Sequence, residues 1–296
     1  MEFKNLHNFG DSEKKPCVYG EAKIVVSPVP YEFAPTYGKG VKGGPRAIIE
    51  ASNNMESFDD ELFQDTYDIL GIHTLKALKV GKAKPEVVIN RVEGTVKSIL
   101  NDGKFPVTLG GGHSVSIGCA MAFRNRFKNF SVLQLDAHCD MRDSYMGSKY
   151  NHACVARRIC EYFPLVQVGA RSLSKDEYDF LKKSKNVHAV GFCDMLKNPG
   201  WVEGCLDRLS ENVYVTIDLD VFDPAIMPST GTPEPGGMNW IEVLGVLRKI
   251  SQQKNVVGFD VVELSPVRGM AAPDFLTAKL IYRFLGYIAL KSKKGG

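Results

Sequence analysis

Short apolar runs rich in β-branched residues alternate along the chain with longer segments whose apolar residues recur at helical spacing. This alternation is typical of parallel βαβ units, in which a helix follows each strand and crosses back over the sheet. The apolar runs predict about eight strands, at residues 24–27, 67–70, 106–109, 131–135, 165–168, 187–190, 213–217 and 256–262. The pattern therefore predicts an α/β fold around a parallel sheet.

Amphipathic segments between these runs predict the helices. Apolar residues three or four apart mark two of them, at Val88, Val92, Val96 and Ile99 and at Ile241, Leu244 and Leu247. Ser174 and Glu177 have the S-x-x-E spacing of a capping box, which predicts a helix start. A last helix is expected from about Asp274, with four buried residues at Phe275, Leu280, Phe284 and Ile288.

Glycine-rich segments are short. The longest, YGKGVKGGP at residues 37–45, lacks both G-x-G-x-x-G and the G-K-[ST] ending of nucleotide-binding loops, so a structural or lid loop is expected. The sequence contains no internal repeat and no long Gly/Ser/Pro linker. We therefore expect a single domain that spans residues 1–296.

Composition and charge exclude several classes of protein. The 296 residues carry 37 basic and 34 acidic side chains, a net charge of +3 whose two signs are interspersed, so nucleic acid is not an expected partner. No apolar run approaches the roughly 18 residues that a membrane span needs, and the start of the chain has no apolar signal region. These features predict a soluble cytoplasmic protein with no membrane partner.

The seven cysteines predict neither a disulfide framework nor an all-thiolate zinc site. Their number is odd, and none forms a C-x-x-C pair. They are expected to be reduced and to act as small buried apolar residues. Cys139 lies among polar residues in the segment DAHCD and is expected to point away from them into the core.

Polar side chains follow four of the predicted strands at the point where each strand ends. GGGHS follows residues 106–109, DAHCD follows residues 131–135, DLDVFDP follows residues 213–217, and Glu263 follows residues 256–262. The carboxyl ends of parallel strands point to one edge of a sheet, where ligand crevices form. We therefore expect these side chains to meet at one site.

The spacing of these polar residues predicts a metal centre. Asp136, His138 and Asp140 alternate along an extended segment and share one face, as do Asp218 and Asp220. Beside His113 they would bring four carboxylates together, an arrangement that repulsion and desolvation make costly without cations.

Two His and four Asp exceed the ligand count of a single zinc site and suit a pair of divalent ions. Oxygen-rich ligation favours two Mn(II) ions, with Ni, Co or Zn as substitutes. Water bound to such ions is a nucleophile near neutral pH.

GGGHS, DAHCD, DLDVFDP followed by STGTPEPGG, and DVVELSP occur here in the same order as in the ureohydrolase family of arginases, agmatinases and their relatives. The segment VPYEFAPTYGKGVKGGPRAI is similar to the family's N-terminal part, so the resemblance covers nearly the whole chain. It implies a three-layer α/β/α fold with an eight-stranded parallel sheet. It also implies dimanganese hydrolysis of a small guanidino substrate to urea and an amine, and a homo-oligomer, either a trimer or a hexamer.

The resemblance also implies roles for individual residues. The metal ligands would be His113, Asp136, His138, Asp140, Asp218 and Asp220. Asp140 would also orient the attacking hydroxide. His152, in KYNHA, matches the family's proton shuttle and could protonate the departing amine. Glu263 matches the glutamate that binds the guanidinium, to which a carboxylate can form two parallel hydrogen bonds.

Agmatine is the predicted substrate, with putrescine and urea as products. The segment after DAHCD lacks the Ser/Asn-rich loop with which arginases bind an α-amino acid, and the TPEPGG and NMESFDDEL segments resemble agmatinases. Gly112, however, stands where agmatinases and arginases usually carry an acidic residue, and GGGH also occurs in formimidoylglutamases. Arginase, guanidinobutyrase, guanidine hydrolase and formimidoylglutamase activities stay open.

Two further readings come from other classes. A dinuclear metallophosphatase could use the same ligands, but no basic cluster near the motifs would bind a phosphate. A metal-binding relative without activity would be expected to lack a ligand, His152 or Glu263, and none of these is missing.

Overall fold

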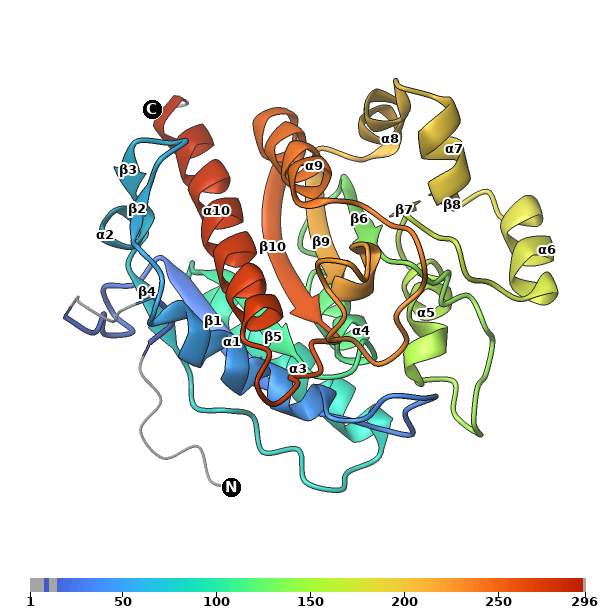
Figure 1. Ribbon diagram of the computed structural model, residues 1–296, viewed down its shortest axis with the longest axis horizontal. Coiled ribbons are helices and arrows are strands. Elements are labelled where there is room, and N and C mark those ends of the chain that lie inside the picture. The colour runs from blue at the N-terminus through green and yellow to red at the C-terminus, as the bar shows by residue number, and fades with distance from the viewer. Residues whose placement is uncertain (1–7, 11–14, 295–296) are drawn as a thin grey trace.

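The computed structural model describes residues 8–10 and 15–294 of the chain. An eight-stranded sheet lies at the centre in the order β4, β1, β5, β10, β9, β6, β7, β8, and every neighbouring pair is parallel (Figure 1). The strands are β1 (Ile24–Val29), β4 (Ile72–Thr74), β5 (Phe105–Gly110), β6 (Phe130–Leu135), β7 (Leu165–Val168), β8 (Val187–Val190), β9 (Asn212–Asp218) and β10 (Asn255–Val262). The predicted α/β fold with an eight-stranded parallel sheet is confirmed.

Helices cover both faces of this sheet and complete three layers (Figure 1). One face carries α1 (Gly44–Ser52), α9 (Trp240–Gln253) and α10 (Ala272–Lys294), and the other carries α3 (Pro85–Asn101), α4 (Val115–Met121) and α5 (Val155–Ile159). The remaining helices are α2 (Thr66–Leu70), α6 (Lys175–Lys183), α7 (Phe192–Lys197) and α8 (Trp201–Arg208), with 3-10 turns η1 (Val41–Gly43), η2 (His152–Cys154) and η3 (Leu219–Val221). A two-stranded antiparallel ribbon pairs β2 (Phe58–Asp59) with β3 (Gln64–Asp65).

Two apolar cores lie on opposite faces of the sheet, because successive side chains of a strand point to opposite sides. In β9, Val213, Val215 and Ile217 pack into the core beneath α1, α9 and α10, while Tyr214 packs into the core beneath α3, α4 and α5. Burial on both faces explains why the strands read as nearly continuous apolar runs in the sequence.

Seven predicted strands coincide with strands of the sheet, but the prediction for residues 67–70 is wrong. These residues form the short helix α2, and the eighth strand, β4, follows directly after it. The Asp65 carboxylate accepts a hydrogen bond from the Asp68 N–H and caps the helix, and Gly71, with φ of +60°, ends it. A capped turn thus overrides the β propensity of the run.

The predicted helices are present, with two errors in their buried faces. Ser174 and Glu177 form the expected capping box at the start of α6. Ile241 is 72% exposed because it lies in the first turn of α9, facing solvent, and Phe275 is 38% exposed near the start of α10. Leu280 and Phe284 are buried as expected.

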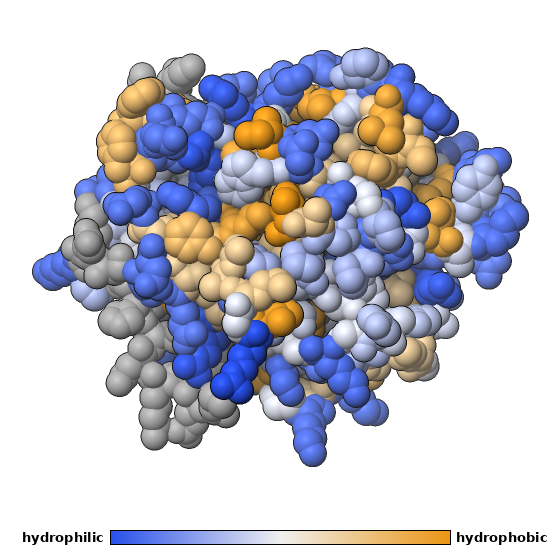
Figure 2. Space-filling model, in the orientation of Figure 1, coloured by the Kyte–Doolittle hydropathy of each residue, from blue (hydrophilic) through white to orange (hydrophobic). Residues whose placement is uncertain are grey.

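The surface seen in Figure 2 mixes hydrophilic residues with smaller apolar groups. Within the described ranges, no helix combines the length and apolar character needed to cross a membrane. All seven cysteines carry free thiols, and Cys139 is buried in the core beneath α3, α4 and α5, away from the polar site, as predicted.

Candidate metal centre and active site

The candidate site lies at the carboxyl ends of β5, β10, β9 and β6, the four neighbouring strands in the middle of the sheet. His113 follows β5, Glu263 follows β10, Asp218 ends β9, and Asp136 follows β6. Because all these strands are parallel, segments that are more than a hundred residues apart in sequence deliver their polar side chains to one edge. The six predicted ligands meet there in two overlapping groups.

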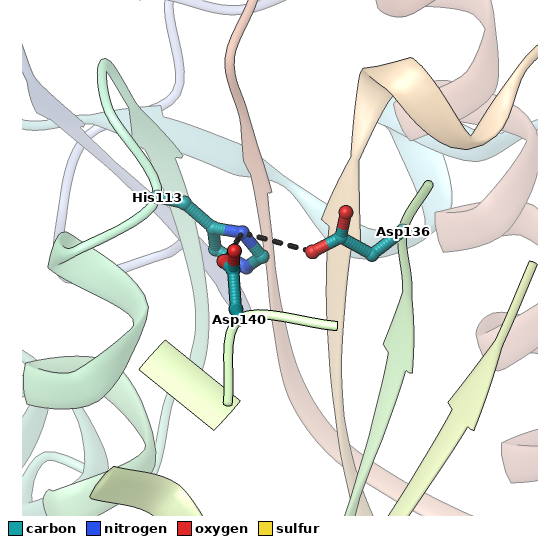
Figure 3. A group of neighbouring side chains, drawn as sticks. All are labelled: His113, Asp136 and Asp140. Carbon is teal, nitrogen blue, oxygen red and sulfur yellow. Dashed lines mark ion pairs between the residues drawn. The ribbon is translucent and has the colours of Figure 1, made fainter. Parts of the chain in front are cut away.

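The first group surrounds Nδ1 of His113, and Figure 3 shows this ring with Asp136 and Asp140. The nearest carboxylate oxygens of Asp136, Asp140 and Asp218 lie 3.2, 3.2 and 3.1 Å from this nitrogen. All four side chains are buried, with at most 6% of each residue exposed. Oxygen and nitrogen donors from three strand ends therefore converge on one point.

The second group surrounds His138. Its Nδ1 lies 2.8 Å from an Asp220 oxygen and 3.7 Å from Oδ1 of Asp136, and the same Oδ1 accepts a hydrogen bond of 2.6 Å from the His138 N–H. Asp136 thus belongs to both groups, with a different oxygen directed to each. A carboxylate shared in this way suits two cations side by side.

Hydrogen bonding fixes the proton of His113 on the far side of its ring. Nε2 lies 3.1 Å from the Thr216 hydroxyl oxygen, and this hydroxyl donates to buried Asp260 at 2.8 Å. Asp260 also accepts hydrogen bonds from Ser116 and Tyr214. Nε2 therefore donates to Thr216, which leaves Nδ1, on the side of the carboxylates, as the nitrogen that could bind a metal ion.

A cation fits this arrangement. Among the described residues, the buried His113 Nδ1 has no hydrogen-bond partner, and it faces three buried carboxylates. Burial, together with the charge of Asp136, raises the pKa of Asp140 to about 7. Divalent ions would satisfy the imidazole and remove this repulsion.

Removal of divalent ions is expected to lower the melting temperature. Ligand at a hundred times its Kd stabilises a fold by about 2.7 kcal/mol, which corresponds to roughly 4 °C for a chain of this size. Scanning calorimetry with Mn(II) and with EDTA measures the difference. Equal melting temperatures in the two buffers would argue against the metal centre.

Backbone geometry is unusual at two residues of the site. Asp140 has φ of +51° and Glu263 has φ of +67°, both in the left-handed region that residues with a side chain seldom occupy. At Glu263 this turn aims the carboxylate back to the His113 N–H, which donates to it at 2.7 Å. This hydrogen bond therefore connects the turn after β10 to the segment that carries the proposed metal ligand His113.

Glycines keep the space beside the Glu263 carboxylate open. A Cβ built on Gly112 or on Gly231 would lie 3.5 Å from a Glu263 oxygen, so a longer side chain would crowd it. Burial raises the pKa of Glu263 to about 7. A cationic guanidinium beside it would favour its charged form.

His152 lies on the wall of the same cavity. Its Nε2 is 2.9 Å from the Thr36 hydroxyl oxygen, and its ring meets Tyr145 edge-on with 5.9 Å between the ring centres. Burial lowers the pKa of His152 to about 4, so the imidazole is neutral at pH 7. A neutral imidazole has one ring nitrogen that can accept a proton.

A cavity of about 240 Å³ opens in front of these groups. His113, His138, Asp140, Asp218 and Asp220 line its floor together with Glu263 and His152. Asp136 lies behind them and does not reach the surface of the cavity. The structure thus brings every predicted site residue to the cavity or directly beneath it.

Arg171 positions the site although the sequence did not point clearly to it. Its guanidinium donates to main-chain carbonyls of three separate segments, at Gly169, at Asp220, Val221 and Phe222, and at Glu234 and Pro235. One side chain therefore joins the loop that carries Asp220 to the TPEPGG segment. Its targets are carbonyl groups, which leave no trace in the sequence.

Replacing Arg171 by lysine is expected to destabilise the fold by about 2 kcal/mol, because the ammonium has three donors and cannot span both loops. Guanidinium chloride unfolding measures this difference. Arg208→Lys, at an exposed arginine of α8, is the matched control. Equal stability of the two variants would contradict the positioning role.

The whole chain is similar to proteins of known activity. A family model described as the arginase family matches residues 22–286. N(1)-aminopropylagmatine ureohydrolase of Synechocystis sp. is 39% identical over 283 residues, covering 93% of this chain and 92% of that protein. Agmatinase of Pyrococcus horikoshii is 35% identical over 278 residues, covering 91% and 93%. The crystal structure of agmatine ureohydrolase of Thermoplasma volcanium has a TM-score of 0.87 and 33% identity, covering 99% of this chain and 97% of that chain.

Proposed function

The chain belongs to the arginase family, and from that premise we propose that it hydrolyses the guanidino group of agmatine to putrescine and urea. It is a ureohydrolase of the agmatinase type, a hydrolase of C–N bonds in linear amidines. The observation that carries the proposal is the pair of His and Asp groups that share Asp136 and lie beside Glu263 in one cavity.

A second candidate substrate is N(1)-aminopropylagmatine. The Synechocystis relative that is 39% identical to this chain is named for it, as are two relatives from Thermus thermophilus that are 34% identical. Both candidate substrates carry a guanidinium at one end of an aliphatic chain and an ammonium at the other. The proposed chemistry at the guanidinium is the same for both.

The metal is proposed to be a pair of Mn(II) ions held by His113, Asp136, His138, Asp140, Asp218 and Asp220. Four of these six ligands are carboxylates, which favours manganese, and Ni, Co or Zn are possible substitutes. When bound, the ions supply a water of lowered pKa as the nucleophile and stabilise the negative charge that develops on the substrate.

The protein's own groups complete the reaction. Glu263 holds the planar guanidinium by charge and hydrogen bonds, so that its central carbon faces the metal cluster. Asp140, in its left-handed turn, orients the nucleophilic water toward the guanidinium carbon. His152, neutral at rest, takes up a proton at its ring nitrogen and delivers it to the amine that leaves.

Product release from Mn(II)-loaded protein tests the proposal, measured as urea from the guanidines, formamide from formimidoylglutamate and inorganic phosphate from the phosphate ester. The panel consists of agmatine, N(1)-aminopropylagmatine, arginine, guanidinobutyrate, guanidine, formimidoylglutamate and a phosphate ester, with Asp218→Ala as the blank. Preference for agmatine supports the proposal, and preference for aminopropylagmatine favours the second candidate. Turnover of the phosphate ester alone, or of nothing, would refute it.

A further inference from the structure

Among the described residues, six carboxylates line the cavity, and five of them face the metal groups or the proposed guanidinium position. Asp140, Asp218 and Asp220 belong to the metal groups, and Glu263 faces the proposed guanidinium position. A Glu234 oxygen lies 3.7 Å from Nε2 of His138, so this carboxylate faces a metal ligand. The sixth, Glu32, lies in the part of the cavity wall formed by the segment near the N-terminus and does not belong to the metal groups.

Glu32 is held firmly in a loop that closes one side of the cavity. One of its carboxylate oxygens accepts a hydrogen bond of 2.6 Å from the Gly40 N–H, which fastens the two ends of residues 32–40 together. The loop is attached to the rest of the site where the Gly38 N–H donates to the Gly231 carbonyl and the Ser265 hydroxyl donates to the Lys39 carbonyl. The loop expected from the glycine-rich sequence is therefore a fixed wall of the site.

The surroundings of Glu32 suit an aliphatic cation. Phe33, Tyr37 and Tyr145 line the cavity and offer apolar and aromatic surface to a methylene chain. The basic side chain of the lining, Arg142, stacks over the Tyr145 ring with 5.0 Å to its centre and approaches Glu177 at 3.9 Å. Its charge is therefore shared with groups other than Glu32.

We infer that Glu32 binds the terminal ammonium of the substrate and so selects guanidines that carry an amine at the far end of an aliphatic chain. This inference rests on the proposed function. Glu263 and Glu32 would then bind the two charged ends, with the alkyl chain along the aromatic wall between them. A guanidine without the ammonium keeps only one of these two attachments.

The test compares agmatine with n-butylguanidine, which lacks the ammonium, in the wild type and in Glu32→Gln. The glutamine oxygen can still accept the Gly40 N–H, so the variant removes the charge and keeps the loop. A charged hydrogen bond is worth roughly a ten- to hundredfold change in affinity. We expect kcat/KM for agmatine to fall by that factor, mainly through KM, while kcat/KM for n-butylguanidine stays within about twofold. The same comparison with N(1)-aminopropylagmatine shows whether Glu32 binds the ammonium of the longer chain.

Glu50→Gln, at an exposed glutamate of α1, is the matched control and should change neither rate. Equal losses on agmatine and n-butylguanidine in Glu32→Gln would assign Glu32 to loop structure and overturn the inference. Wild-type enzyme that hydrolyses both guanidines equally well would also overturn it while leaving the proposed function intact. Wild-type enzyme that releases urea from no guanidine would refute the proposed function, and the inference with it.

Discussion

Replacing Asp136 by alanine is expected to abolish urea release and to reduce bound manganese from the proposed two ions per chain to one or none. Asp136 is the carboxylate that both groups share, with one oxygen directed to His113 and the other to His138. The ions contribute several kcal/mol of transition-state stabilisation, and each 1.4 kcal/mol is tenfold in rate, so the loss should exceed roughly a thousandfold. Elemental analysis after gel filtration measures the metal, and urea release measures the rate.

Two companion variants separate loss of the site from loss of the fold. Asp207→Ala removes an exposed aspartate of α8 and should leave metal content and rate unchanged. Asp136→Asn retains an acceptor for the His138 N–H and should fold normally in EDTA, because it removes one of the repelling charges. An Asp136→Ala protein that still holds two ions and keeps its rate would refute the shared ligand.

Glu263→Gln is expected to lower kcat/KM by about a hundred- to a thousandfold with no loss of metal. The variant removes the charge that pairs with the guanidinium, and breaking a buried charge pair costs about 2–5 kcal/mol. The glutamine oxygen can still accept the His113 N–H, so the metal group should stay in place. Steady-state kinetics and elemental analysis of the same preparation measure both quantities.

The interpretation depends on kcat/KM falling while the metal content stays unchanged. A Glu263→Gln protein that loses its ions would assign the glutamate to the metal cluster instead of the substrate. A protein that keeps both its ions and its rate would show that the guanidinium is bound elsewhere. Glu203→Gln, at an exposed glutamate of α8, controls for removal of an acidic side chain at a distance from the site.

Residues that act through their own side-chain spacing could be predicted from the sequence. The meeting of His113, Asp136 and Asp218 follows from the shared edge of a parallel sheet. The D-x-H-x-D spacing correctly marked Asp136, His138 and Asp140, but the expected single face is wrong, because Asp140 lies in a left-handed turn beyond β6. Asp220 likewise lies in the 3-10 turn η3 and not on an extended segment with Asp218. The strand at residues 67–70 could not be judged in this way, because the Asp65 cap converts the same apolar run into a helix.

Roles that depend on the backbone or on distant partners could not be assigned from the sequence, which left Arg171 open between a residue of the substrate crevice and one of a helix-capping turn. The targets of Arg171 are carbonyl groups of three separate segments, and Asp260 supports His113 only by way of the Thr216 hydroxyl. Glu32 becomes a candidate only when the other carboxylates of the cavity have been accounted for. Each of these roles depends on which segments fold against one another, which periodicity along one segment does not specify.

The left-handed backbone of Asp140 and Glu263 lowers the stability of the fold at two positions whose carboxylates the proposed reaction needs. A non-glycine residue in this region costs of the order of 1–3 kcal/mol, and glycine would avoid that cost while removing the carboxylate. Mutations selected only for a more robust fold would therefore tend to erase these two side chains. A lineage that no longer needed the reaction would gain stability by replacing Asp140 and Glu263. Substitutions at these two positions would therefore be an early sign that the activity has been lost.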